Sequence, residues 1–479
     1  MRIVCLPIDS RPCNTQFIRS LTEWAGGELT LPSKEIQDDF TRPAAFEDSL
    51  RFLKEALPGA DGAVISLDHL CYGSLLASRE ESVTDEEALD RAACLRELAR
   101  EHAGVPIYLN TVVLRSSIST LKAGDLGAYE AMTAYSESSD RWERFRLPAD
   151  RKRMEEAMAR LPEGLLDRTL RIRKRNLRVN LAAVEMAAEG LLAGLSIVQE
   201  DSQEYGLPRK DQRVIEQRLK ELGLEGIRIR NGTDEAGAVQ AAKALCRGRE
   251  PLEAEIRWIG DGSFTAPYED RPFRENVETA CAEAGIRQTE GSGTVILILC
   301  PERGEKAEVT EPMSETWLNR CAEAADAAVG EGGRVYLLDV MRANGGVPEL
   351  MGRMREADGL WGYSAWNTAS NALGTLLAQA VTDGMAGKPN RAFLQERLLD
   401  DMAYEGRIRG LLNARLREKG EDVFHLRDKA GAERLLREAY EDELRAIWPL
   451  RQMPRYRVSL PWNRTFEVKA EILGEEPEN

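Results

Sequence analysis

The sequence has 479 residues, of which 43% are hydrophobic, so the chain can fill a sizeable core and is neither disordered nor fibrous. Its formal net charge of -16, from 81 acidic and 65 basic residues, repels phosphate-rich polymers and argues against nucleic acid as a partner. A small-molecule substrate, neutral or weakly charged, fits this composition better.

Neither a membrane segment nor a secretion leader is expected. The longest strongly apolar run, Thr294 to Cys300, is far shorter than the roughly 18 to 20 residues that cross a bilayer. The N-terminal apolar run is too short for the core of a signal peptide and leads directly to Asp9. The eight cysteines include no C-x-x-C pair, so we expect reduced thiols and a cytoplasmic location.

Nine short apolar runs, most of which end in polar residues, predict the strands of an α/β protein. Patterns of helical period lie between most of them, which indicates a parallel sheet with helices packed outside it. The predicted strands are 2–8, 62–67, 105–109, 195–199, 226–230, 255–259, 294–300, 334–338 and 359–363.

Helix signals support this order of elements. Thr84 and Glu87 form a capping-box pattern before an apolar stripe, which predicts a helix after the second strand. The segment 118–194 is rich in charge and too long for an ordinary connection, so we expect a helical insertion that borders the site. From about 390 onward, charged helices are followed by two runs of alternating residues that predict terminal strands.

Two architectures fit the α/β class. We favour a (β/α)8-like barrel with a long helical insertion and a C-terminal extension, because a barrel uses the carboxyl ends of many strands. The alternative is two doubly wound, Rossmann-like domains divided near residue 250. We expect an α/β catalytic domain over 1–390, which includes the insertion 118–194, and a C-terminal helical element with terminal strands over 391–479.

Two adjacent carboxylates, Glu200 and Asp201, directly follow the predicted strand 195–199. Adjacent acids at a strand end can have different pKa values, because burial and the neighbouring charge raise one while the other stays ionised. This difference suits acid/base catalysis, so both are predicted catalytic residues. In the alternative interpretation, one acid caps the following helix and the other is solvated.

Other polar and aromatic side chains near the predicted strand ends are candidates for binding a substrate. Acids and amides can hydrogen-bond hydroxyl groups, arginine can bind in a bidentate manner, and aromatic rings can stack on a sugar. A structural role as a cap, turn or ion pair is the alternative for each. The candidates are Asp9, Arg11, Asp68, Tyr72, Asn110, Arg115, Tyr205, Asp234, Glu235, Asp339, Asn344, Trp366 and Asn367.

No cofactor is expected, because the sequence contains no G-x-G-x-x-G, P-loop, G-x-S-x-G or HExxH motif. The three histidines are not spaced to share a metal from one helix face, so no zinc site is predicted. One alternative remains, a metal-dependent hydrolase or lyase in which oxygen ligands hold a hard cation. The acids that could gather it are Asp9, Asp68, Glu200, Asp201 and Asp339.

Six motifs spread over nearly the whole chain form a pattern. They are Asp9-Ser10-Arg11-Pro12, Asp68 with Tyr72-Gly73, Glu200-Asp201 with Tyr205-Gly206-Leu207, Gly232-Thr233-Asp234-Glu235, Trp366-Asn367-Thr368 and Pro461-Trp462-Asn463-Arg464-Thr465-Phe466-Glu467. The pattern resembles a bacterial family of roughly 500-residue proteins catalogued as a domain of unknown function. In that family an Asp-Asp pair stands where this chain has Glu200-Asp201. The resemblance implies no reaction.

The motifs are also similar, more weakly, to barrel-type glycoside hydrolases of the retaining β-hexosaminidase kind. In those enzymes one acid orients the acetamido group of the substrate and its neighbour protonates the leaving oxygen. The main hypothesis is therefore a glycoside hydrolase-like enzyme that cleaves a small oligosaccharide or glycoconjugate, with Asp201 as the general acid. A non-catalytic sensor of a sugar or metabolite is a further alternative.

The site hypothesis makes a geometric prediction. Six of the polar residues should meet in one cleft at the carboxyl edge of the sheet, because each follows a strand in the same sense. They are Asp9, Asp68, Asn110, Asp201, Asp234 and Asn367.

Overall fold

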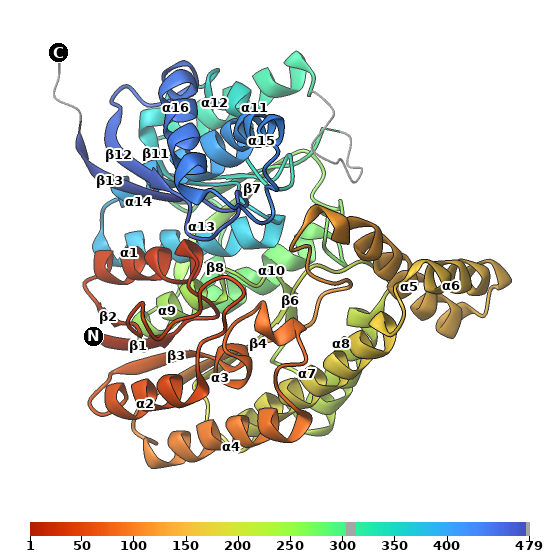
Figure 1. Cartoon of the computed structure of the whole chain (residues 1–479). Helices are drawn as coiled ribbons and strands as arrows, with labels where there is room; N and C mark the ends of the chain where they lie inside the picture. The colour runs from red at the N-terminus through yellow and green to blue at the C-terminus, as the bar shows by residue number, and fades with distance from the viewer. Residues whose placement is uncertain (303–312, 476–479) are drawn as a thin grey trace. The chain divides into compact units, whose positions relative to one another are not determined.

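The structure, a computed structural model, describes residues 1–302 and 313–475. It divides into two compact units (Figure 1). Unit 1 consists of Met1–Leu245 and Tyr268–Arg271, and unit 2 of Cys246–Pro267 and Pro272–Asn479. All nine predicted strands are present. Two further strands of three residues each, β2 (Glu28–Thr30) and β8 (Ile286–Gln288), are too short to show a period in the sequence.

Unit 1 contains a six-stranded parallel sheet in the order β2-β1-β3-β4-β5-β6. Its other strands are β1 (Arg2–Leu6), β3 (Gly62–Ser66), β4 (Ile107–Val113), β5 (Gly194–Gln199) and β6 (Ile229–Asn231). Helices cover both faces of the sheet (Figure 1). One face is covered by α1 (Gln16–Trp24) and α9 (Ala236–Leu245), and the other by α2 (Phe46–Ala56), α4 (Asp85–Glu101), α7 (Leu165–Ala188) and α8 (Leu207–Glu221).

Unit 2 contains a five-stranded parallel sheet in the order β11-β10-β9-β7-β8. The strands besides β8 are β7 (Leu252–Ile259), β9 (Thr294–Leu299), β10 (Arg334–Asp339) and β11 (Leu360–Ser364). Successive side chains of β10 lie on opposite faces of the sheet. Val335 and Leu337 belong to a core with α11 (Glu315–Gly330), whereas the Tyr336 hydroxyl donates a 3.2 Å hydrogen bond to Asp383 of α13 (Ala369–Ala386).

These two sheets correct the preferred architecture. In the described residues the parallel strands lie in two separate sheets and do not form a single eight-stranded barrel. The chain passes from one unit to the other after Leu245, close to the division near residue 250 of the alternative architecture. Numbered within each unit, the first five strands have the same order, 2-1-3-4-5. Polar residues are expected at the carboxyl ends of the strands in both architectures. Their presence therefore could not distinguish a barrel from two open sheets.

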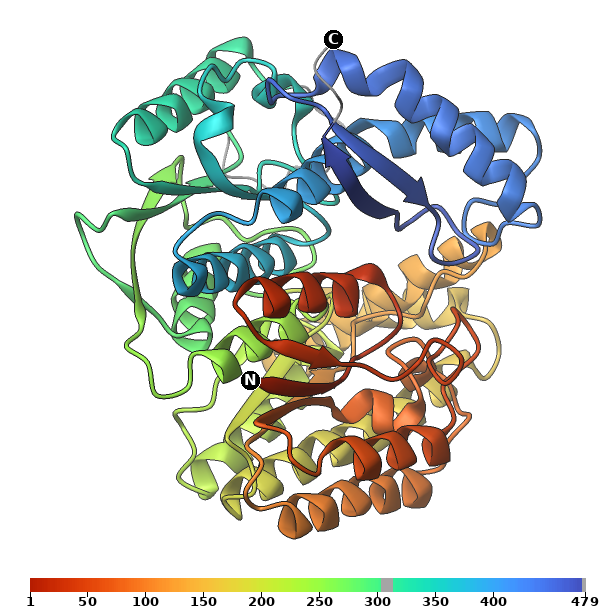
Figure 2. The same cartoon turned by 90° about the vertical axis from the view of Figure 1, so that its left-hand side faces the viewer.

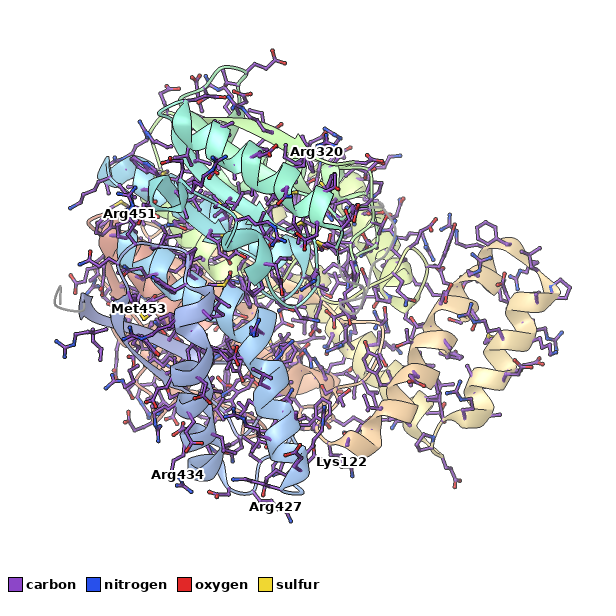
Figure 3. The ribbon with its side chains drawn as sticks, turned by 90° about the horizontal axis from the view of Figure 1, so that it is seen from above. Lys122, Arg320, Arg427, Arg434, Arg451 and Met453 are labelled. Carbon is purple, nitrogen blue, oxygen red and sulfur yellow. The ribbon has the colours of Figure 1, made fainter. Side chains whose placement is uncertain are left out.

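The insertion in unit 1 is helical, as predicted. It contains α5 (Leu126–Phe145), α6 (Pro148–Arg160) and α7, and Figures 1 and 3 both show α5 and α6 side by side. The capping box before α4 is also present, since Thr84 Oγ1 accepts from the Glu87 amide at 3.2 Å.

The chain beyond residue 390 belongs to unit 2. It contains α14 (Arg391–Arg397), a π-helical segment (Leu398–Ile408), α15 (Arg409–Glu418) and α16 (Lys429–Ile447). An antiparallel pair, β12 (Pro454–Ser459) and β13 (Lys469–Glu475), follows and appears in dark blue in Figure 2. Among the helices of the described residues, none is long and apolar enough to cross a membrane.

Candidate active site in unit 1

The strand order of unit 1 reverses between β1 and β3. The chain leaves β1 through α1 on one face to reach β2, and the later strands are added on the other side of β1 by connections over the opposite face. In open α/β sheets, ligands bind outside the carboxyl ends of the strands at such a switch point. Here the segments at that position are 7–15, after β1, and the short helix α3 (Leu67–Tyr72), after β3.

Asp9, Arg11 and Asp234 form a buried ion-pair network at this point. Arg11 donates to Asp9 Oδ2 through Nη2 at 2.7 Å, and to the two oxygens of Asp234 at 2.5 and 3.0 Å. Asn14 adds a 2.8 Å hydrogen bond to Asp9 Oδ1. Burial acts to raise the pKa of Asp9, but the charge of Arg11 and these hydrogen bonds outweigh it and hold the pKa below its ordinary value.

Glu200, directly after β5, lies between two arginines. Its Oε1 is ion-paired with Arg79 and lies 3.8 Å from Arg115 Nη1. Its Oε2 is buried and has no hydrogen-bond partner. Burial raises the pKa of Glu200 above its ordinary value, although both arginines act to lower it. This carboxyl group therefore has one anchored oxygen and one free oxygen.

Asp201 has a different environment from its neighbour. Arg115 forms an ion pair with its carboxylate, and the Ser116 amide donates to its main-chain oxygen at 3.0 Å. Its side chain is 26% exposed, against 8% for Glu200. Of the two predicted catalytic acids, only Glu200 is therefore removed from water.

Asp68, in the first turn of α3, is also buried. Its Oδ2 accepts from the Val112 amide of β4 at 2.9 Å. Burial, together with the charge of Glu200, raises the pKa of Asp68 to about 7, although the hydrogen bond from the Val112 amide acts to lower it. Glu200 also interacts electrostatically with Asp234, so the acids after β1, β3, β5 and β6 belong to one network.

The insertion borders this network. Tyr129 of α5 lies with its ring centre 5.7 Å from the guanidinium carbon of Arg115. Arg173 of α7 donates to the main-chain oxygens of Leu114 and Arg115 at 2.8 and 2.9 Å. The loop that carries Arg115 is thus fixed from the insertion side.

Four other predicted residues of unit 1 lie within a strand or are held by local contacts. Asn110 is inside β4, which runs to Val113, so it does not follow the strand as predicted. The ring of Tyr72 is buried beneath Arg175, whose guanidinium carbon lies 4.4 Å from the ring centre. Tyr205 packs on Phe145 with ring centres 5.5 Å apart. Glu235 is buried in an ion pair with Arg230.

The other four predicted residues belong to unit 2. Asp339 accepts hydrogen bonds from the Met341 and Val347 amides at 3.2 and 2.9 Å, which closes the loop after β10. The Trp366 indole donates to Thr375 at 3.1 Å. Asn344 and Asn367 both have left-handed backbone, with φ of 59° and 54°, and are joined by a 2.8 Å main-chain hydrogen bond. The six residues of the geometric prediction are thus divided, with Asn367 in the other unit.

Two members of the network, Asp38 and Arg79, and the buried acid Asp270 beside β6 were not predicted. Asp38 lies after β2, Arg79 lies in a short helical turn (Ala77–Arg79), and Asp270 accepts from Asn231 at 3.0 Å and from Gln212 at 2.7 Å. The acid pair Asp38-Asp39 was a usable signal, but β2 was not recognised, so nothing placed that pair at the carboxyl edge. Arg79 has no motif around it.

The acids of the network face arginines and backbone amides. Within the described residues no group of three or more histidine, cysteine, aspartate or glutamate side chains could hold a metal ion. The alternative of a cation held by the strand-end acids therefore has no preformed set of ligands in this part of the chain.

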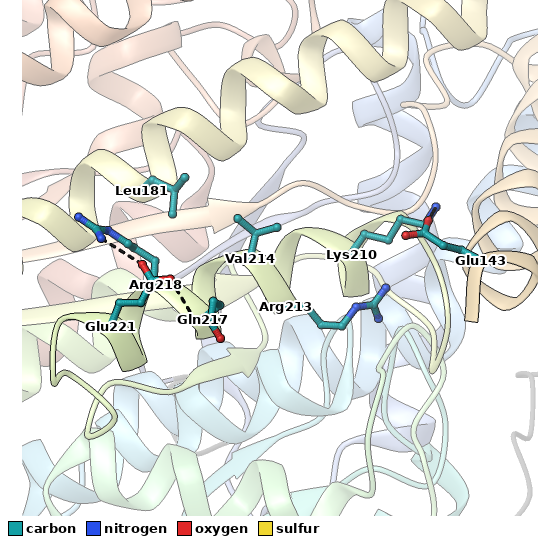
Figure 4. A pocket seen from close by; sticks show the side chains of 8 residues that line it. All are labelled: Glu143, Leu181, Lys210, Arg213, Val214, Gln217, Arg218 and Glu221. Carbon is teal, nitrogen blue, oxygen red and sulfur yellow. Dashed lines mark hydrogen bonds and ion pairs between the residues drawn. The ribbon is translucent and has the colours of Figure 1, made fainter. Parts of the chain in front are cut away.

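A separate surface groove of about 530 Å³ lies on unit 1 (Figure 4). Its lining residues are Glu143, Leu181, Lys210, Arg213, Val214, Gln217, Arg218 and Glu221. Its cations are already paired: Lys210 lies 2.6 Å from Glu143, and Arg218 lies 3.1 Å from Glu221. None of the network acids lines it, so we do not place the active site there.

The fold and this network define an α/β protein of two open, doubly wound sheets, with buried carboxylates and arginines at the switch point of the first. The chain belongs to the family described as protein of unknown function (DUF4127), whose sequence model matches residues 3–471. This confirms the family resemblance predicted from the motifs. No match to the sequence was found among curated proteins.

Proposed function

We propose that unit 1 is a glycoside hydrolase-like enzyme that acts on a small oligosaccharide or glycoconjugate, with Glu200 as the proton-transferring group. The state of this carboxyl group carries the proposal. It is buried, two arginines lie at one oxygen, and the other oxygen has no hydrogen-bond partner. A carboxyl group whose pKa is raised by burial can retain a proton and give it to a leaving oxygen.

Asp201 takes the complementary role in this proposal. It is paired with Arg115 and partly exposed, which suits a side chain that orients or stabilises the reacting group. The general-acid role that the sequence analysis gave to Asp201 is thus proposed for Glu200. Asp68, whose pKa is raised to about 7, provides a second carboxyl group that can carry a proton beside Glu200.

Substrate binding is proposed to be mainly polar. Within unit 1, Arg175 lies over the ring of Tyr72, and Arg141 and Arg144 lie over the ring of Tyr205, so neither ring offers an open face for stacking. We therefore propose that hydrogen bonds to hydroxyl groups, and not stacking on these two rings, hold the substrate in unit 1.

The test is a screen of chromogenic glycosides with the full chain, followed by variants assayed on any substrate found. Glu200→Gln should lower kcat by about 100-fold or more, because loss of general acid catalysis has that size. Asp201→Asn should also lower kcat. Glu221→Gln, in the surface groove outside the network, is the matched control and should leave the activity unchanged.

Other results would redirect the proposal. Turnover that Glu200→Gln leaves intact would remove Glu200 from the mechanism. A stoichiometric divalent metal in the purified protein, found by elemental analysis, would favour the metal-dependent hydrolase or lyase. A sugar that raises Tm but is not cleaved would favour the sensor.

A further inference from the structure

One more carboxyl group lies in the network of unit 1. Asp38 belongs to the segment between β2 and α2, and its side chain is buried, with the residue 3% exposed. Ser10 donates its hydroxyl to Asp38 Oδ2 at 3.3 Å. The second oxygen, Oδ1, is buried and has no hydrogen-bond partner. A buried polar atom without a partner requires an explanation, and a ligand is one.

The backbone that carries Asp38 is fixed against the switch point. The Ala44 amide donates to the main-chain oxygen of Gly73 at 3.1 Å, which joins the segment to the end of α3. Gly73 has φ of 94°, and a Cβ there would collide with the Ala44 main-chain oxygen. Only glycine therefore permits this close approach.

Asp38 and Asp9 cannot both carry a charge without cost. Asp9 is committed to Arg11 and Asn14 and stays ionised, whereas Asp38 has only the Ser10 contacts beside it. The charged groups that act on Asp38 are Asp9, which favours the proton, and Arg11, which opposes it. When two carboxyl groups share a site, the one without a cation keeps the proton. Burial and Asp9 together raise the pKa of Asp38 to about 8.

We propose that Asp38 is a ligand-binding residue of this site, which stays protonated beside Asp9 and donates a hydrogen bond through Oδ1 to a ligand oxygen. The proposal rests on the proposed function in placing a polyhydroxylated ligand at the switch point. It adds to the site a hydrogen-bond donor for the ligand, which is not needed for the proposed roles of Glu200 and Asp201. A neutral carboxyl group can donate, whereas an ionised one can only accept.

The experiment is a carbon-13 NMR titration of the full chain labelled at aspartate carboxyl carbons. One resonance should titrate near pH 8 and be absent from Asp38→Asn. Asp9→Asn should move its midpoint to lower pH, because the charge that favours the proton is removed. Asp39→Asn, the exposed neighbour, is the matched control and should leave the resonance in place. Should Asp38→Asn fail to fold, the shift in Asp9→Asn still identifies the resonance.

The ligand arm adds glucose, galactose and N-acetylglucosamine in turn at pH 6. At least one should move the Asp38 resonance, and its affinity should fall about tenfold per pH unit above the midpoint. A midpoint in the ordinary range near 4, or no shift with any of the sugars, would overturn the proposal. The turnover of Glu200→Gln tests the proposed function, and the NMR titration tests the role of Asp38. Because the two measurements are independent, the failure of one proposal can be distinguished from that of the other.

Discussion

Arg11 is the residue on which the carboxylates after β1 and β6 depend. It bonds Asp9 and Asp234 at once, and all three side chains are almost inaccessible to water. Removing one partner of a buried ion pair is far more costly than breaking a surface pair, because the remaining charges stay buried without compensation. Replacing Arg11 therefore removes a buried ion-pair partner from Asp9 and from Asp234 at once.

Arg11→Met should accordingly lower the free energy of unfolding by about 3 to 5 kcal/mol. Arg19→Met is the matched control, since Arg19 forms an exposed pair with Glu23 and should cost less than about 1 kcal/mol. Urea denaturation followed by circular dichroism measures both. Equal losses for the two variants would show that the buried network is not a source of stability.

Asp68 should make stability depend on pH in a direction opposite to that of a salt-bridged acid. Its folded pKa, about 7, lies above its ordinary value of 3.8, so the folded state binds the proton more tightly. That contribution is fully present below the ordinary pKa and is lost as pH rises through the folded pKa. Between these values the loss is at most about 1.4 kcal/mol per pH unit.

The comparison of wild type with Asp68→Asn isolates this effect. The stability of wild type relative to the variant should fall between pH 5 and pH 7, as measured by urea unfolding at each pH. Asp39→Asn, at an exposed position, should show no such trend relative to wild type. A difference between wild type and Asp68→Asn that stays constant with pH would mean that Asp68 titrates normally.

At the scale of elements, the predictions that rested on local chemistry were confirmed. The helix α4 begins at the predicted capping box, where the Thr84 amide donates to Glu87 and the Glu87 amide donates to Thr84. Strand β4 was predicted too short, because its polar residues Asn110 and Thr111 interrupt the apolar run although both are buried. The hydrophobic period of a sequence indicates which apolar side chains are buried. It does not indicate buried polar side chains, such as these two.

Thr84→Ala should therefore lower the free energy of unfolding by about 1 kcal/mol, the usual effect of losing an N-cap side chain. Thr84→Ser, which keeps the hydroxyl group, should restore most of it. Thermal unfolding of the two variants gives the comparison. A loss in Thr84→Ser as large as in Thr84→Ala would point to packing of the methyl group instead of capping.

The sequence predicts charged helices from about residue 390 onward but not the π geometry of the segment Leu398–Ile408. This segment contains Asp401, which accepts from the Ala365 amide at 2.8 Å and from Arg397 at 2.7 Å. Whether a helix takes π geometry depends on such tertiary bonds, which no local pattern encodes. Tertiary contacts also explain why the different environments of Glu200 and Asp201 could not be predicted. The sequence placed them together after β5, but only the folded positions of Arg79 and Arg115 give them different environments.

At the scale of the whole molecule, the order 2-1-3-4-5 recurs in both sheets, and the buried ion pairs of Arg11 lie at the switch point of unit 1. The sequence contained the strands of both units but not their pairing. The order of strands in a sheet depends on which strands lie side by side in the folded chain. The residues at the strand ends are compatible with several such orders. The preference for a barrel therefore rested on a feature that two open sheets share.

Each unit has its own apolar core, and this predicts that unfolding of the full chain is not two-state. Ile65 lies in a core of unit 1 and Leu337 in a core of unit 2, and both are fully buried. Each change to alanine should cost about 2 to 5 kcal/mol. If the cores unfold separately, Ile65→Ala should lower the urea midpoint of one transition and Leu337→Ala that of another.

Tryptophan fluorescence can assign the transitions, because Trp24 and Trp142 lie in unit 1 and the other six tryptophans in unit 2. The signal should therefore be dominated by the transition that Leu337→Ala moves. Circular dichroism should report both transitions, since both units contain helices. A single transition that both variants shift equally by both probes would show that the two cores unfold as one cooperative body, in which case the stability of the site in unit 1 would depend on unit 2 as well.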